Sequence, residues 1–100
     1  MSKKYAIVEL EKDDGIIDIS LIRKVNVIRI VGNVDAASKY LRTLAYQKLS
    51  EHLDMCDDSH SIDHFYVDKY DGCLTVTDIF FGAKNVKTYY WSVKETFEAE

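Results

Sequence analysis

A single stretch of this chain repeats its apolar residues with the spacing of an α-helix. Between positions 33 and 53 they recur every three or four residues and would form one stripe: Ala37, Tyr40, Leu41, Leu44, Ala45, Leu49 and Leu53. Asn33 can accept hydrogen bonds from the first-turn amides, and Asp35 suits the positive end of the helix dipole. Because one helix cannot bury its own stripe, the core must be completed by other elements.

The segments on both sides of this helix alternate apolar and polar residues as β-strands do. The expected strands are 4–11, 16–22 and 23–31 before the helix, and 65–69, 73–81 and 86–93 after it. Glycine marks expected turns at 12–15, 70–72 and 82–85. A bend or bulge is needed near 23–26, since 16–31 exceeds a typical strand. The sequence therefore predicts an α+β fold, a mainly antiparallel sheet of five to six strands packed against one central helix in the order βββαβββ.

Length and composition place the chain among small globular proteins. Its 100 residues suit one domain, 1–100, with 94–100 as an acidic tail that frays. Apolar runs stay far below the roughly 18–20 residues of a membrane span, and the apolar run near the start is too short for a signal peptide. Two cysteines, Cys56 and Cys73, are too few for a disulfide framework. We expect a cytoplasmic protein that does not associate with membranes.

The second half of the chain is acidic and rich in aromatic residues. Residues 51–100 hold eleven Asp and Glu against four Lys and Arg, and nine of the twelve aromatics follow position 64. Neighbours such as Phe80-Phe81 and Tyr89-Tyr90-Trp91 must point to both faces of a sheet. Such rings fit a partner surface and core packing equally well. The partner surface predicted from this pattern consists of Asp57, Asp58, Asp63, Tyr66, Asp68, Tyr70, Asp71, Tyr89 and Trp91.

These features favour a small non-enzymatic protein-binding module with a basic protein as its partner. A small, acidic, proline-free, aromatic-rich single domain is similar to many accessory proteins of bacterial viruses, a similarity of size and charge. Such a protein could inhibit a host nucleic-acid-binding or defence protein. A second copy of the chain could also bind to the exposed aromatics and form a homodimer. Because no phosphate-binding glycine loop, Gly-x-Ser-x-Gly elbow or His-Glu-x-x-His motif occurs, we expect neither catalysis nor a cofactor.

Nucleic-acid binding is the first of two alternatives. A basic face of the helix, together with basic residues before it, could contact phosphate groups. The residues concerned are Arg23, Lys24, Lys39, Arg42 and Tyr46. The net charge of −4 opposes this function, and the strands lack the glycine-aromatic motif of the common RNA-binding sheets.

A metal site is the second alternative. His52, Cys56, His60 and His64 recur every four residues, and imidazole and thiolate are ligands that suit zinc. Their spacing matches no common zinc motif, and several aspartates crowd the same segment. The competing interpretation is a polar loop at 54–64 whose histidines are exposed to solvent.

Overall fold

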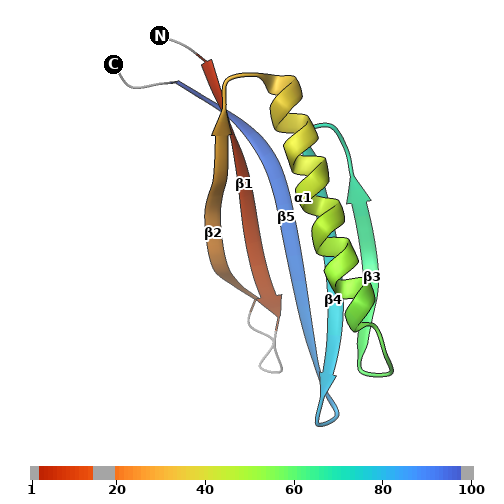
Figure 1. The fold of residues 1–100 in the computed structure, drawn as a ribbon. Helices are drawn as coiled ribbons and strands as arrows, with labels where there is room; N and C mark the ends of the chain where they lie inside the picture. The colour runs from red at the N-terminus through yellow and green to blue at the C-terminus, as the bar shows by residue number, and fades with distance from the viewer. Residues whose placement is uncertain (1–2, 15–19, 98–100) are drawn as a thin grey trace.

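The computed structural model describes residues 3–14 and 20–97 and shows a two-layer molecule, one sheet with one helix across it (Figure 1). The elements are β1 (Lys3–Asp14), β2 (Ser20–Val31), α1 (Val34–Met55), β3 (His60–Val67), β4 (Asp71–Phe80) and β5 (Ala83–Phe97). All five strands are antiparallel to their neighbours, in the order β2-β1-β5-β4-β3. The expected α+β class, an antiparallel sheet packed on one helix, is confirmed.

The N-terminal half differs from expectation in its number of strands. Residues 20–31 form one strand, because β2 pairs with β1 along its whole length. The bend expected near 23–26 is present as a bulge: Glu11 pairs with Lys24 and Lys12 with Ile22, so Arg23 has no partner in the register. An extra residue is accommodated without ending the strand. Residues 12–14, expected in a turn, continue β1 and pair with strands on both sides. Gly15 and the start of the expected second strand lie outside the described residues.

In the C-terminal half, several boundaries move. Residues 60–64 belong to β3 instead of a loop, 94–97 belong to β5 instead of a tail, and the last turn is 81–82. Gly72 lies within β4 instead of a turn. A Cβ atom there would come within 3.3 Å of the Tyr66 carbonyl oxygen and 3.4 Å of the Trp91 ring. A side chain at this position would therefore be tight against the Tyr66 backbone, which favours glycine.

The core lies between α1 and one face of the sheet. Ile7, Leu74, Val76 and Trp91 from three strands pack against the predicted helical stripe, of which Ala37, Leu41 and Ala45 are fully buried. Asn33 caps the helix as expected, accepting hydrogen bonds from the amides of Asp35 and Ala36. Leu53 was expected in the stripe but is 57% exposed, and His52 is buried in the last turns of the helix.

The sheet has a second face that α1 does not cover. Within residues 3–14 and 20–97, no other element lies across it (Figure 1). The principal dimensions of 53 × 26 × 15 Å describe a thin slab of two layers. No helix in the described part is long and apolar enough to cross a membrane.

Candidate functional site

The β4–β5 hairpin ends in a two-residue turn with an unusual backbone. Phe80 pairs with Ala83, and Phe81 and Gly82 between them have φ angles of 52° and 78°. Positive φ at both central residues is the geometry of a type I′ turn, which favours Asn-Gly or Gly-Gly. Phe81 is the one non-glycine residue with positive φ in the described ranges. A bulky side chain here strains the backbone by about 1–2 kcal/mol.

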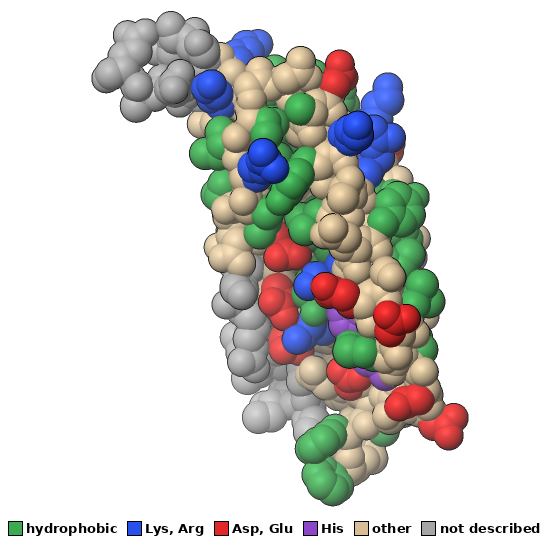
Figure 2. Space-filling view, viewed as in Figure 1, with side chains coloured by type: hydrophobic (Ala, Val, Ile, Leu, Met, Phe, Trp, Pro, Cys, Tyr) green, Lys and Arg blue, Asp and Glu red, His purple; other side chains and the backbone are tan. Residues whose placement is uncertain are grey.

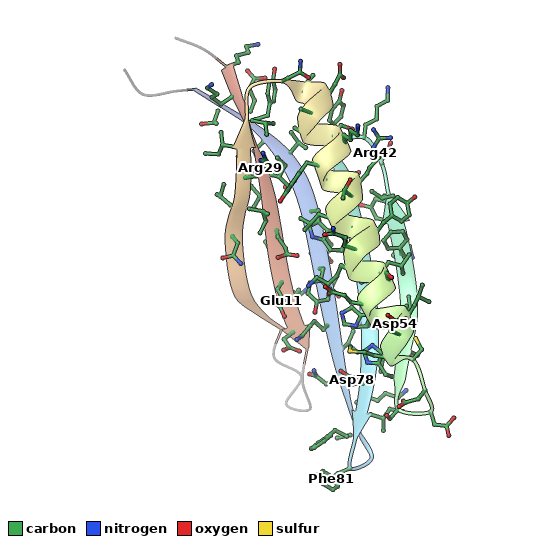
Figure 3. The ribbon with its side chains drawn as sticks, in the orientation of Figure 1. Glu11, Arg29, Arg42, Asp54, Asp78 and Phe81 are labelled. Atoms are coloured by element: carbon green, nitrogen blue, oxygen red, sulfur yellow. The ribbon has the colours of Figure 1, made fainter. Side chains whose placement is uncertain are left out.

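The two aromatic side chains of this turn lie in solvent. Phe81 is 95% exposed and Phe80 is 71% exposed, the highest values among the large hydrophobic residues described. Their rings pack edge to face with centroids 4.6 Å apart. Figure 3 shows Phe81 at the far end of the hairpin, directed away from the core. The ring therefore contributes no core packing that would offset the strain of its backbone.

An acidic loop lies beside this aromatic pair. The loop at 56–59 connects α1 to β3, and the Ile79 amide of β4 donates to the Ser59 carbonyl at 2.7 Å. Asp57 accepts hydrogen bonds from the backbone amide and hydroxyl of Ser59, which lower the pKa of this carboxyl group and keep it ionised. Asp58 is exposed next to it. Apolar and acidic side chains thus lie at the same end of the molecule (Figure 2).

A pocket of about 590 Å³ adjoins the aromatic pair. It is lined by Ser59, Asp78, Ile79, Phe80, Ala83, Lys84 and Asn85. We call the pocket together with Asp57, Asp58 and Phe81 the tip surface. Its three aspartates, Asp57, Asp58 and Asp78, outnumber the single lysine, Lys84, so the tip surface carries net negative charge.

Two buried histidines hold the tip surface to the helix. His52 of α1 and His60 of β3 stack with ring centroids 5.1 Å apart, and His52 Nδ1 lies 2.9 Å from His60 Nε2. His60 Nδ1 also hydrogen-bonds to the half-exposed Asp78 of β4. This chain of side chains connects three elements where the loop and hairpin meet. It fixes the loop and the hairpin relative to each other.

Burial of His52 predicts a stability that depends on pH. Burial, followed by the neighbouring His60 and Lys48, lowers the pKa of His52 from its ordinary value of 6.5. The unfolded chain therefore binds more protons below pH 6.5, and the free energy of unfolding falls as the pH is lowered through this range. Urea unfolding from pH 8 to pH 5 measures this slope, and His52→Asn should flatten it. A wild-type stability that rises on acidification would contradict this role.

The predicted metal cluster is only partly assembled. His52 and His60 meet, whereas Cys56 is exposed after the helix and His64 packs against Tyr66. In the ranges 3–14 and 20–97, no three His, Cys, Asp or Glu side chains are arranged to hold a metal ion. The expectation of a polar loop with exposed histidines at 54–64 is wrong for His60, because residues 60–64 extend β3 under the helix, whereas His64 is exposed as expected.

The predicted partner surface is divided by the fold. Asp57 and Asp58 lie at the tip, whereas Asp68 and Tyr70 lie in the turn at the opposite end of β3. Tyr89 and Trp91 are buried against α1, 7% and 1% exposed, which corrects their predicted place on the partner surface. The remaining members lie on the sheet face that α1 leaves free: Asp63, Tyr66 and Asp71.

Phe80 and Phe81 were missing from that predicted surface, although their sequence contains a signal. The pair Phe81-Gly82 stands between two alternating strands that need a two-residue turn. Only the pairing of Phe80 with Ala83 shows that Phe81 itself occupies a turn position with positive φ.

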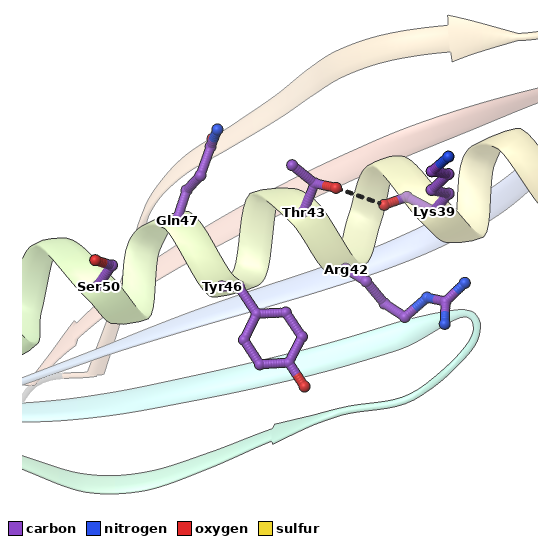
Figure 4. Close-up of a pocket in the computed structure, with 6 residues that line it drawn as sticks. All are labelled: Lys39, Arg42, Thr43, Tyr46, Gln47 and Ser50. Carbon is purple, nitrogen blue, oxygen red and sulfur yellow. Dashed lines mark hydrogen bonds between the residues drawn. The ribbon is translucent and has the colours of Figure 1, made fainter.

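The two basic residues predicted on α1 lie on one face of the helix. Lys39, Arg42 and Tyr46 are exposed and, with Thr43, Gln47 and Ser50, line a shallow pocket along the helix (Figure 4). The Thr43 hydroxyl donates to the Lys39 carbonyl at 3.0 Å. The side chains of Arg23 and Lys24 lie outside the described part of the structure.

Comparisons of the chain with protein-family models, with curated proteins and with solved structures return no match.

Proposed function

We propose that this chain is a non-enzymatic protein-binding module that docks through its tip surface. The observation that carries the proposal is Phe81, whose ring is 95% exposed although its backbone has a φ of 52°. Asparagine or glycine would form the same turn with less strain. A strained aromatic that adds nothing to the core is best explained by a contact with a partner.

The chemistry of the tip surface defines the partner. Phe80 and Phe81 require an apolar pocket, and Asp57, Asp58 and Asp78 beside them favour basic groups around that pocket. An exposed aromatic pair can also enter a lipid surface. The adjacent carboxylates would then face anionic headgroups and be repelled. A basic protein therefore fits the tip surface better than a membrane does.

Capture from a lysate of the source cells tests this function with matched variants. The wild-type chain should retain a basic protein that Phe81→Asn and the double variant Asp57→Lys, Asp58→Lys both lose, and raised salt should weaken retention. Tyr70→Ser is the control, because Tyr70 is a 48% exposed aromatic in the turn at the other end of β3. If Tyr70→Ser loses the partner and Phe81→Asn retains it, the binding surface lies at the Tyr70 end of β3 and not at the tip surface. Flotation with anionic vesicles that depends on Phe81 would favour a membrane.

Nucleic-acid binding is a second candidate, supported by the pocket that Lys39, Arg42 and Tyr46 share on α1. A gel-shift assay with single- and double-stranded DNA and RNA in dilute salt should then show a complex. Lys39→Glu with Arg42→Glu should abolish it, whereas the two lysine substitutions at Asp57 and Asp58 should not. Absence of any shift with the wild-type chain would remove this candidate.

A further inference from the structure

The sheet face opposite α1 has an apolar centre. Because Ile7, Leu74 and Trp91 point toward the helix, their neighbours along each strand point away from it. The exposed apolar residues on this uncovered face are Val25, Val27, Ile30, Tyr66 and Tyr90. Val8 and Leu10 are half-buried among them, and Ala6 and Cys73 are buried. Val25 and Val27 are each 59% exposed, and Ile30 is 56% exposed. One row, Val25, Leu10, Tyr90, Cys73 and Tyr66, crosses all five strands.

Polar residues surround this centre. Lys4, Lys94 and Lys12 lie along the strands on either side of it, and Asp71 and Asp63 lie toward β3. An apolar centre inside a polar rim is the usual anatomy of a protein interface. Contiguous exposed apolar side chains rimmed by polar residues mark interaction sites on protein surfaces.

Both edges of the sheet are less suited to binding than its face. The outer strands are β2 and β3. Each contains a bulge, with Ile28 and Asp63 lacking a partner in the register in addition to Arg23. Bulges on outer strands discourage the addition of a further strand. A partner of this sheet would therefore cover the face instead of extending an edge.

We infer that a second copy of this chain covers the uncovered face, forming a symmetric face-to-face dimer. The five strands are 8 to 15 residues long. At about 3.3 Å per residue and about 4.8 Å between strands, they give a face of roughly 900 Å². A standard-size interface buries about 800 Å² per partner. The face carries both lysines and aspartates, so two copies can pair their rims although the chain's net charge is −4. The basic partner of the tip surface would be disfavoured here by the three lysines.

Sedimentation velocity and light scattering at micromolar and submillimolar concentration test the dimer. The wild-type chain should reach twice its 11.5 kDa monomer mass. Val27→Lys with Tyr90→Lys should raise the dissociation constant on the order of 100-fold, because the two charges would be buried against the second copy. Leu53→Lys is the control, since Leu53 is equally exposed, at 57%, but lies on α1.

A wild-type chain that stays monomeric at both concentrations would overturn the inference, as would a dimer that the double lysine variant leaves intact. Should the double variant fail to fold by circular dichroism, Val27→Lys alone on the outer strand serves in its place. High salt distinguishes the dimer from docking through the tip surface. The apolar dimer should persist in high salt, whereas capture of a basic protein by the tip surface should weaken.

Discussion

Replacing Trp91 with alanine is expected to lower the free energy of unfolding by about 3–5 kcal/mol, because a fully buried aromatic ring leaves a cavity. Trp91 is 1% exposed, stacks against Tyr89, and donates its indole N–H to the Glu9 carboxylate at 2.9 Å. Urea denaturation monitored by circular dichroism measures the loss.

Tyr90→Ala is the matched control for this substitution. Tyr90 is next to Trp91 in β5 but lies on the uncovered face and is 42% exposed. In dilute, monomeric protein its removal should cost well under half as much stability. Equal losses for the two variants would contradict the assignment of strand faces, and with it the surface inferred for the dimer.

Phe81→Asn is expected to have opposite effects on stability and on binding. Asparagine tolerates positive φ, so the free energy of unfolding should rise by about 1 kcal/mol as backbone strain is relieved. Partner affinity should fall on the order of 30-fold or more, since removal of an aromatic anchor costs about 2 kcal/mol or more. Thermal unfolding and titration calorimetry with the captured partner measure the two effects.

Phe81→Ala separates the ring from the backbone. Alanine also lacks the ring but is poorly suited to positive φ, so this variant should lose affinity without the full gain in stability. If Phe81→Asn leaves both stability and binding unchanged, neither the strain nor the anchor is present at this position.

Much of the fold follows from local patterns in the sequence. The Asn33 cap and the apolar repeat after it predict α1, and alternation predicts most of the strands. The predicted element boundaries are wrong where a residue typical of turns is present for tertiary packing instead. Gly72 looks like part of an Asp-Gly turn, but it is a buried strand residue that packs closely against the Tyr66 carbonyl oxygen.

The candidate site is harder to predict from the sequence, because the strand register determines which of its residues come together. Alternation along the strand places Tyr90 on the opposite sheet face from Tyr89 and Trp91. Only the packing of Ile7 and Leu74 on α1 shows which of the two faces is buried. His52 and His60 could not be paired without knowing that β3 begins at His60. The same extension of β3 puts acidic residues that are close in the sequence at different ends of the strand.

Site-specific photo-crosslinking at position 81 tests directly whether Phe81 contacts a protein partner. A benzophenone side chain would replace Phe81 in one chain and Tyr70 in the control, followed by irradiation in the source cells and mass spectrometry. If the tip surface docks on a partner, position 81 should crosslink to one protein, at an apolar segment bordered by basic residues, and position 70 should not. Crosslinks from position 81 that are no more specific than those from position 70 would contradict this docking.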